Sequence, residues 1–227
     1  MRCWGWLVLG GVVALGCSGL EEGEAGVVAL EVQVPSPPAM EIAETLQLSA
    51  RPLDKDGDSV AATVIWRSPD TTVSVDSIAG RVVGVAAGTA RVQASVGSLS
   101  SDIINLTVLA RADTLAIVGD SIFTLLGDSL ASPPLVVSLQ SLTAGALSDR
   151  PVIYEIATPT PDTAVTLTGG VLSDTVQTGS DGTVTSEILS LNPTKVRPDS
   201  TIIAVRANRT HGEPVPGSGL RFIVRFQ

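Results

Sequence analysis

The chain has 227 residues, of which 44% are hydrophobic but only 3% aromatic, and its formal net charge is −9 at pH 7. This acidic balance disfavours nucleic acid and anionic lipid headgroups as partners, because like charges repel. The length suits two domains of about 100 residues each. The apolar share consists of Val, Leu, Ile and Ala between many Thr and Ser, which is typical of β-sheets. We therefore expect an all-β protein of two domains.

The first twenty residues have the shape of an export signal. A charged start at Arg2 precedes an uncharged apolar run, Trp4 to Gly16, that ends in small residues. Thirteen residues would span only about 20 Å as a helix, short of the roughly 30 Å hydrocarbon core of a bilayer. A permanent membrane helix is therefore not expected here.

The run closes as Val13-Ala14-Leu15-Gly16-Cys17, which resembles the bacterial lipoprotein signal. The family usually has Leu three residues before the cysteine, where this chain has Ala14 followed by Leu15. The resemblance implies removal of residues 1–16, a lipid on Cys17 and, because Ser18 rather than Asp follows, sorting to the outer membrane or cell surface. The alternative is an ordinary secretory signal with an incidental cysteine. If Cys17 carries the lipid, residues 17–26 would form an acidic flexible tether between the anchor and the first domain.

Short alternating runs separated by Gly, Pro, Asp and Ser follow from Val27 onward, about every ten residues. One face of each such run goes to a core and the other to water. Seven strands with turn signals are the sequence criterion for an immunoglobulin-like sandwich. The strands expected in residues 27–110 are Val27 to Val34, Glu44 to Leu53, Ala62 to Arg67, Thr72 to Asp76, Arg81 to Val85, Thr89 to Val96 and Asp102 to Leu109.

The stretches Thr63 to Asp70, Val73 to Asp76 and Gly80 to Ala94 carry a Trp, Ser, Asp and Gly spacing that resembles the group 2 type of bacterial immunoglobulin-like domain. Trp66 would be the large core side chain of a middle strand. The glycines suit turns or bulges that need positive φ or a close backbone approach; they are Gly80, Gly84 and Gly88.

Residues 111–227 are expected to form a second immunoglobulin-like Greek-key sandwich. The segment between the halves, residues 110–112, offers almost no linker, so we expect end-to-end stacking with limited freedom. The half resembles the group 1 type found in invasin and intimin adhesins, on the stretches Val152 to Ile156, Thr178 to Val184 and Thr201 to Ala207. The strands expected here are Thr114 to Val118, Ser121 to Leu126, Leu135 to Gln140, Val152 to Ala157, Ala164 to Leu167, Val171 to Gln177, Thr183 to Leu189, Thr201 to Ala207 and Gly219 to Phe226.

The chain offers little from which to build a catalytic site. His211 is the only histidine, in a polar turn before Pro214, whereas a nucleophilic Ser or Cys needs a base beside it. No Gly-rich phosphate loop follows a strand and opens a helix. We expect a protein that is not an enzyme and has no cofactor, with His211 as an exposed loop residue.

The most metal-like cluster is Asp54, Asp56 and Asp58, since Ca²⁺ takes several carboxylate oxygens. At the twelfth position of a loop that starts with Asp54, however, an EF-hand would need a bidentate Glu, and this chain has Ile65. We interpret the cluster as a β-turn closed by Asp-Gly, with a weak surface calcium site as the alternative.

Sugar binding would need exposed aromatic rings, and beyond the signal only five aromatic residues remain. Most are expected in cores, which leaves Tyr154 as the one candidate for a glycan platform. The favoured function is a non-catalytic envelope lipoprotein that binds a protein partner by adhesion or acts as a spacer. The alternative is an accessory lipoprotein that binds polysaccharide or calcium.

Overall fold

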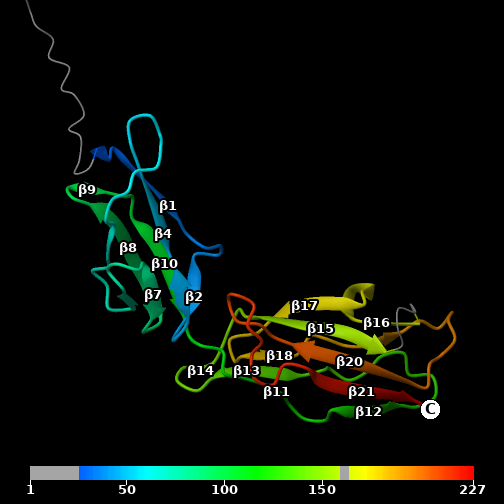
Figure 1. Cartoon of the computed structure of the whole chain (residues 1–227). Coiled ribbons are helices and arrows are strands. Elements are labelled where there is room, and N and C mark those ends of the chain that lie inside the picture. The colour runs from blue at the N-terminus through cyan, green and yellow to red at the C-terminus, as the bar shows by residue number, and fades with distance from the viewer. Residues whose placement is uncertain (1–25, 159–163) are drawn as a thin grey trace, which may run out of the picture.

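The structure is a computed structural model that describes residues 26–158 and 164–227. These residues are all-β, with no α-helix among them, and they form tandem immunoglobulin-like sandwiches, as predicted (Figure 1). The predicted signal, Cys17 and nearly all of the tether lie outside the described residues. The hydrophobic side chains divide into one core built from residues up to Val108 and another that begins at Ala112.

The first sandwich encloses the Trp66 core between two layers. One layer consists of the β1-β4 pair and the three-stranded sheet β3-β7-β6, which adjoin because only Leu48 lies between β3 and β4. The other has the order β2-β10-β8-β5, with β9 on β8. The strands are β1 (Ala29–Gln33), β2 (Ala39–Glu41), β3 (Thr45–Gln47), β4 (Ser49–Leu53), β5 (Ile65–Arg67), β6 (Val73–Val75), β7 (Arg81–Gly84), β8 (Gly88–Val96), β9 (Leu99–Ser100) and β10 (Ile104–Leu109).

Two glycines of the first sandwich lie where a side chain would collide with backbone. Gly80 has φ +68°, and a Cβ there would meet Trp66 Nε1 at 2.7 Å and Leu48 O at 2.8 Å. A Cβ on Gly84 would lie 2.6 Å from Glu41 O. The spacing of these glycines therefore follows from close contacts with the core tryptophan and with the end of β2.

Gly80→Ala is expected to destabilise the first sandwich by about 1–3 kcal/mol more than Gly57→Ala, because only Gly80 adds an overpacking cost. Both residues have positive φ, but a Cβ on Gly57 meets nothing within 4 Å. In a chain that begins at Ser18, Trp66 is the only tryptophan, so its fluorescence during urea unfolding measures the difference. Equal losses in the two variants would contradict the assignment.

The second sandwich has a five-stranded sheet of order β12-β21-β20-β15-β17, faced by β11, β13, β14 and β18 and by the β16–β19 pair. A single turn of 3-10 helix, η2 (Thr168–Gly170), follows β16. The strands are β11 (Thr114–Ile117), β12 (Ile122–Leu125), β13 (Val137–Ser141), β14 (Gly145–Ala146), β15 (Pro151–Thr158), β16 (Val165–Thr166), β17 (Ser173–Gln177), β18 (Thr183–Val184), β19 (Ser190–Leu191), β20 (Ser200–Arg206) and β21 (Leu220–Phe226).

The last strand, β21, pairs on both sides, as its alternating sequence predicts. It is antiparallel to β20 and parallel to β12. Its alternate residues Phe222, Val224 and Phe226 are buried, and the Phe222 ring stacks on Phe123 with 6.2 Å between centroids.

In both sandwiches the first strand divides between the two sheets. β1 pairs antiparallel with β4 and then β2 pairs parallel with β10; β11 pairs antiparallel with β13 and then β12 pairs parallel with β21. The first division falls at Pro35-Ser36-Pro37-Pro38, whose prolines cannot donate to a ladder. The sequence did not predict β2, a three-residue strand whose Met40 and Glu41 are fully buried.

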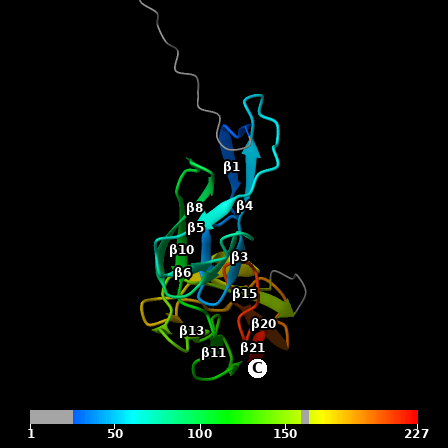
Figure 2. The ribbon, with the colours of Figure 1, turned by 60° about the vertical axis from the view of Figure 1, so that its left-hand side comes forward.

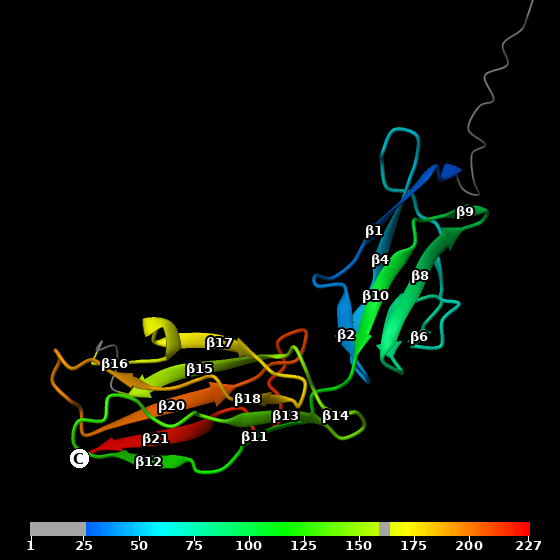
Figure 3. The ribbon, with the colours of Figure 1, turned by 180° about the vertical axis from the view of Figure 1, so that it is seen from behind.

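The two sandwiches meet at a bend. Figures 1 and 3 show the first standing at a steep angle to the second, and Figure 2 shows it above one end of the second. The C-terminus lies at the opposite end of the second sandwich. The short linker was predicted. The two sandwiches are not stacked in a straight line, however, and we call the bend between them, at residues 110–112, the elbow.

Candidate functional site

A buried carboxylate, Glu41, lies at the elbow. It ends β2 and has none of its surface exposed. Its Oε1 accepts a hydrogen bond from Arg150 Nη1 at 3.0 Å, and its Oε2 accepts one from the Ala112 N–H at 3.0 Å and lies 3.7 Å from Arg209 Nε. Glu41 of the first sandwich is thus bound by two arginines of the second and by the linker between them.

Both arginines also bind linker carbonyls. Arg150, just before β15, donates from Nη2 to Ala110 O at 2.6 Å. Arg209, beyond β20, donates from Nε to Ala112 O at 3.2 Å and pairs through Nη1 with Glu213 Oε2 at 2.7 Å. Their side chains are only 13% and 7% exposed. The linker is therefore held on both sides rather than left free.

The turn after β2 fixes where Glu41 points. The Glu41 N–H donates to Glu44 Oε2 at 2.6 Å, and the Ile42 N–H donates to Leu109 O at 3.0 Å, where β10 ends. Glu44 Oε1 in turn lies 2.7 Å from His211 Nδ1. Glu44 therefore orders the turn and contacts the second sandwich through its other oxygen.

The burial of Glu41 is compensated by charge and by hydrogen bonds. An isolated carboxylate taken out of water would cost many kcal/mol, so buried charges are paired. Breaking such a pair from one side typically costs about 3–5 kcal/mol, because it leaves the other charge buried and unpaired. The elbow is therefore the arrangement that satisfies Glu41, Arg150 and Arg209 together.

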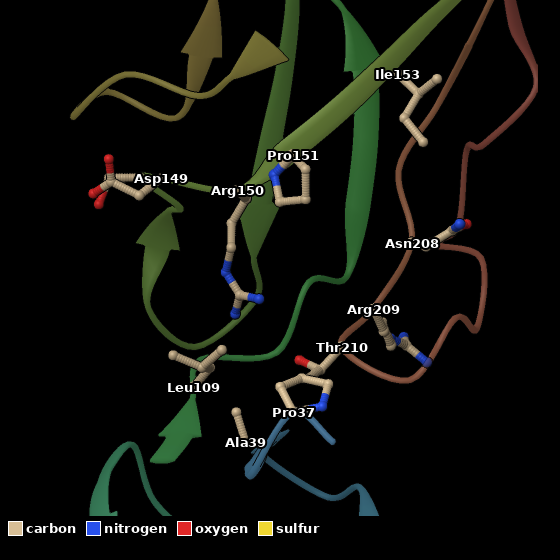
Figure 4. Close-up of a pocket in the computed structure, with 11 residues that line it drawn as sticks. Pro37, Ala39, Leu109, Asp149, Arg150, Pro151, Ile153, Asn208, Arg209 and Thr210 are labelled. Carbon is tan, nitrogen blue, oxygen red and sulfur yellow. The ribbon is translucent and has the colours of Figure 1, made fainter. Parts of the chain in front are cut away.

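A hollow of about 610 Å³ opens beside these arginines. Figure 4 shows Arg150 pointing from the second sandwich toward Leu109, with Pro37 and Ala39 facing it from the first. Thr210, also on its wall, has a buried Oγ1 without a hydrogen-bond partner among the described residues.

The structure places His211 in the exposed turn that its sequence predicts, with its side chain 27% exposed and in contact with Glu44. Tyr154 is different. It is fully buried, its hydroxyl donates to Leu135 O at 2.9 Å, and burial raises the pKa of its phenol. The suggestion that Tyr154 forms a glycan platform was wrong, because β15 turns the ring into the core.

The Asp54 loop has the geometry of a turn. Asp54 Oδ1 accepts from the N–H groups of Asp56 and Asp58 at 2.9 Å each, and the Gly57 N–H donates to Asp54 O. Asp56 pairs with Lys55 at 2.8 Å. In the described parts of the chain no group of three or more His, Cys, Asp or Glu side chains is placed to hold a metal ion.

The sequence did not single out Glu41, Arg150 or Arg209. Its only local signal is Glu41 itself, an acid between the apolar residues Met40 and Ile42. Arg150 is 109 residues away from Glu41 in the chain, and no periodic pattern links positions so distant.

A second acid, Glu187, is buried, and no salt bridge joins it to a cation among the described residues. Its Oε1 accepts from the Thr168 N–H at 2.8 Å, and its Oε2 is buried without a partner among the described residues. Burial raises the pKa of Glu187, and the nearby Asp174 carboxylate raises it further, against the hydrogen bonds from Thr168. Folded Glu187 therefore keeps its proton to a higher pH than a free glutamate does.

Glu187→Gln is expected to remove a pH dependence of the second sandwich. With a raised pKa, folded Glu187 keeps its proton where the unfolded chain has lost it, so stability falls as the pH rises above about 4.5 through the folded pKa. Hydrogen exchange of the β15 and β20 amides between pH 5 and 8 measures this. The variant should be the more stable chain at pH 8.

The matched control is Glu155→Gln, whose side chain is 47% exposed and should leave the slope with pH unchanged. The assignment of Glu187 is contradicted if its variant keeps the slope of the unaltered chain.

No protein-family model matches the chain, and no curated protein matches it. Solved structures share a distant likeness at low identity. Domains 4 and 5 of the S-layer protein SbsC are 16% identical, with 89% of this chain and 99% of that chain covered and a TM-score of 0.35. The Yersinia pseudotuberculosis adhesin InvE is 15% identical, with coverage of 90% and 61% and a TM-score of 0.40. The D00-D0 domain of intimin is 14% identical, with coverage of 86% and 99% and a TM-score of 0.29.

These are bacterial immunoglobulin-like and related β-sandwich proteins, and a likeness this distant says nothing about partners. Among the residues that the structure describes, no helix is both long and apolar enough to cross a bilayer.

Proposed function

We propose that the protein is a non-catalytic envelope lipoprotein whose two sandwiches, residues 27–110 and 111–227, form a stiff arm that acts as a spacer and displays the second sandwich to a protein partner. The observation that carries this proposal is the burial of Glu41 between Arg150, Arg209 and the Ala112 N–H. A freely jointed pair of domains has no need of a buried charge network at its linker.

Stiffness follows from how the network is connected. Relative motion of the sandwiches would pull Glu41 from both arginines and release the carbonyls of Ala110 and Ala112 as well. Each of these groups is poorly exposed, so water could replace the lost partners only after the junction had opened. The angle between the sandwiches is therefore stabilised by the same contacts that bury the carboxylate.

The direction of the arm fits a tether at its beginning. The described chain starts at the end of the first sandwich that is far from the elbow, and the C-terminus lies at the far end of the second (Figure 1). A lipid on Cys17 would place the first sandwich near the membrane and the second away from it. Export and the anchor are supported by the apolar run and by the Gly16-Cys17 pair.

Glu41→Ala should loosen the elbow without unfolding either sandwich, because it leaves Arg150 and Arg209 without their shared partner at a cost of about 3 kcal/mol. The measurement is the distance distribution between spin labels at two exposed strand positions, Ser74 and Thr175, in a chain that begins at Ser18. We expect a narrow distribution in the parent and a broad one in the variant.

The control is Glu31→Ala, which breaks the exposed ion pair with Arg51 in the first sandwich. Exposed pairs contribute little, so the distribution should stay narrow. A parent chain with an already broad distribution would contradict the stiff arm.

The anchor has its own test. The full-length protein, expressed in a bacterium that processes lipoproteins and fed an alkyne fatty acid, should be labelled, and Cys17→Ala should abolish the label and release the protein from the membrane fraction. An unlabelled parent that is recovered in the soluble envelope fraction would instead show an ordinary secretory signal.

A further inference from the structure

The outer face of the second sandwich's five-stranded sheet combines partly exposed isoleucines with exposed arginines. Isoleucines from three adjacent strands form a row across it, since Ile223 of β21 is in register with Ile122 of β12 and with Ile202 of β20. Ile122 is 50% exposed and the other two are partly exposed. Contiguous apolar side chains facing water are a feature of protein-binding surfaces.

Arginines flank the row on both sides. Arg221 and Arg225 precede and follow Ile223 by two residues on the same face of β21, about 13 Å apart along the strand. Both are exposed, and neither side chain has a hydrogen-bond or ion-pair partner among the described residues. Two cations without a partner among the described residues thus lie on either side of an apolar centre.

The charge of this face is opposite to that of the chain. The charged residues pointing outward from β12, β21, β20 and β15 are Arg206, Arg221, Arg225 and Glu155, and Arg206 already pairs with Glu155 at 2.7 Å. Within these strands three arginines against one glutamate give a net charge of +2, whereas the whole chain carries −9. The exposed Asp120 lies just before β12, two residues from Ile122. The neighbouring strand positions are filled by small polar or apolar residues: Thr124, Ser200 and Ala204.

We propose that the outer face of β12, β21 and β20 docks an acidic protein, one whose binding surface has an apolar centre flanked by carboxylates. The unpaired arginines would pair with those carboxylates, and the isoleucine row would be covered by the apolar centre. Two copies of this chain meeting through the same face would bring like charges together, so a symmetric dimer is disfavoured. A glycan is disfavoured as well, because the three aromatic rings of these strands, Phe123, Phe222 and Phe226, pack on the core.

This inference rests on the proposed function, in which the arm displays the second sandwich, but it uses different residues. The variants that test it leave Glu41 and the elbow unaltered, so the spin-label distances should not change. Failure of the docking surface and failure of the stiff arm are therefore separate results.

The probe is the full-length protein with a photoreactive benzoylphenylalanine at Thr124, which faces outward beside Arg225. Irradiation in its native envelope should give a discrete protein adduct that the same residue at Thr107 of the first sandwich does not give. The cross-linked protein is then identified and purified. Its binding should weaken with salt and should fall by about tenfold or more in Arg221→Glu/Arg225→Glu, because each pairing becomes a repulsion.

The matched control is Arg67→Glu, a reversal of an exposed arginine at the end of β5, which should bind like the parent. If the double reversal fails to fold, Arg221→Gln/Arg225→Gln takes its place with the same direction of change. The proposal is overturned if no adduct forms at Thr124, if the adduct is another copy of this chain, or if the purified partner binds the reversed and parent proteins equally.

Discussion

The elbow depends on the fact that a carboxylate cannot be taken out of water without compensation. Glu41 is fully buried at the end of a three-residue strand, and its cationic partners among the described residues are Arg150 and Arg209 of the other sandwich. Once these arginines are in place they also bind the linker carbonyls. One buried charge thereby sets the angle between two sandwiches whose hydrophobic cores are separate.

The divided first strand makes this arrangement possible. In each sandwich it crosses from one sheet to the other and ends beside the last strand. In the first sandwich the crossing brings Glu41 beside Leu109, where the chain leaves for the second. The same small strand therefore forms the edge of the β10-β8-β5 sheet and places the Glu41 carboxylate at the junction.

Charged side chains of the described chain lie in three different environments. Glu41 is buried with cations, whereas Glu187 is buried without one and has a raised pKa. Arg221 and Arg225 are exposed, without hydrogen-bond or ion-pair partners among the described residues, on a face that also carries the Arg206–Glu155 pair. Arg150 and Arg209 have a structural role within the chain, because they neutralise Glu41. It gives no folding role to the unpaired arginines of β21, whose positions suit a partner outside the chain.

The sequence by itself determined the all-β class, the alternation of β8, β10 and β21 and the near absence of a linker, because these are local patterns of period two and of turn residues. It missed β2, whose three residues are too few to show a period. It also suggested that Tyr154 is exposed, whereas this side chain of β15 points into the core. Only the tertiary structure decided the elbow and the isoleucine row. Glu41 meets Arg150 across 109 residues, and Ile122 meets Ile223 only because β12 pairs with β21. Contacts of this kind depend on strand order and on register, which no local pattern encodes.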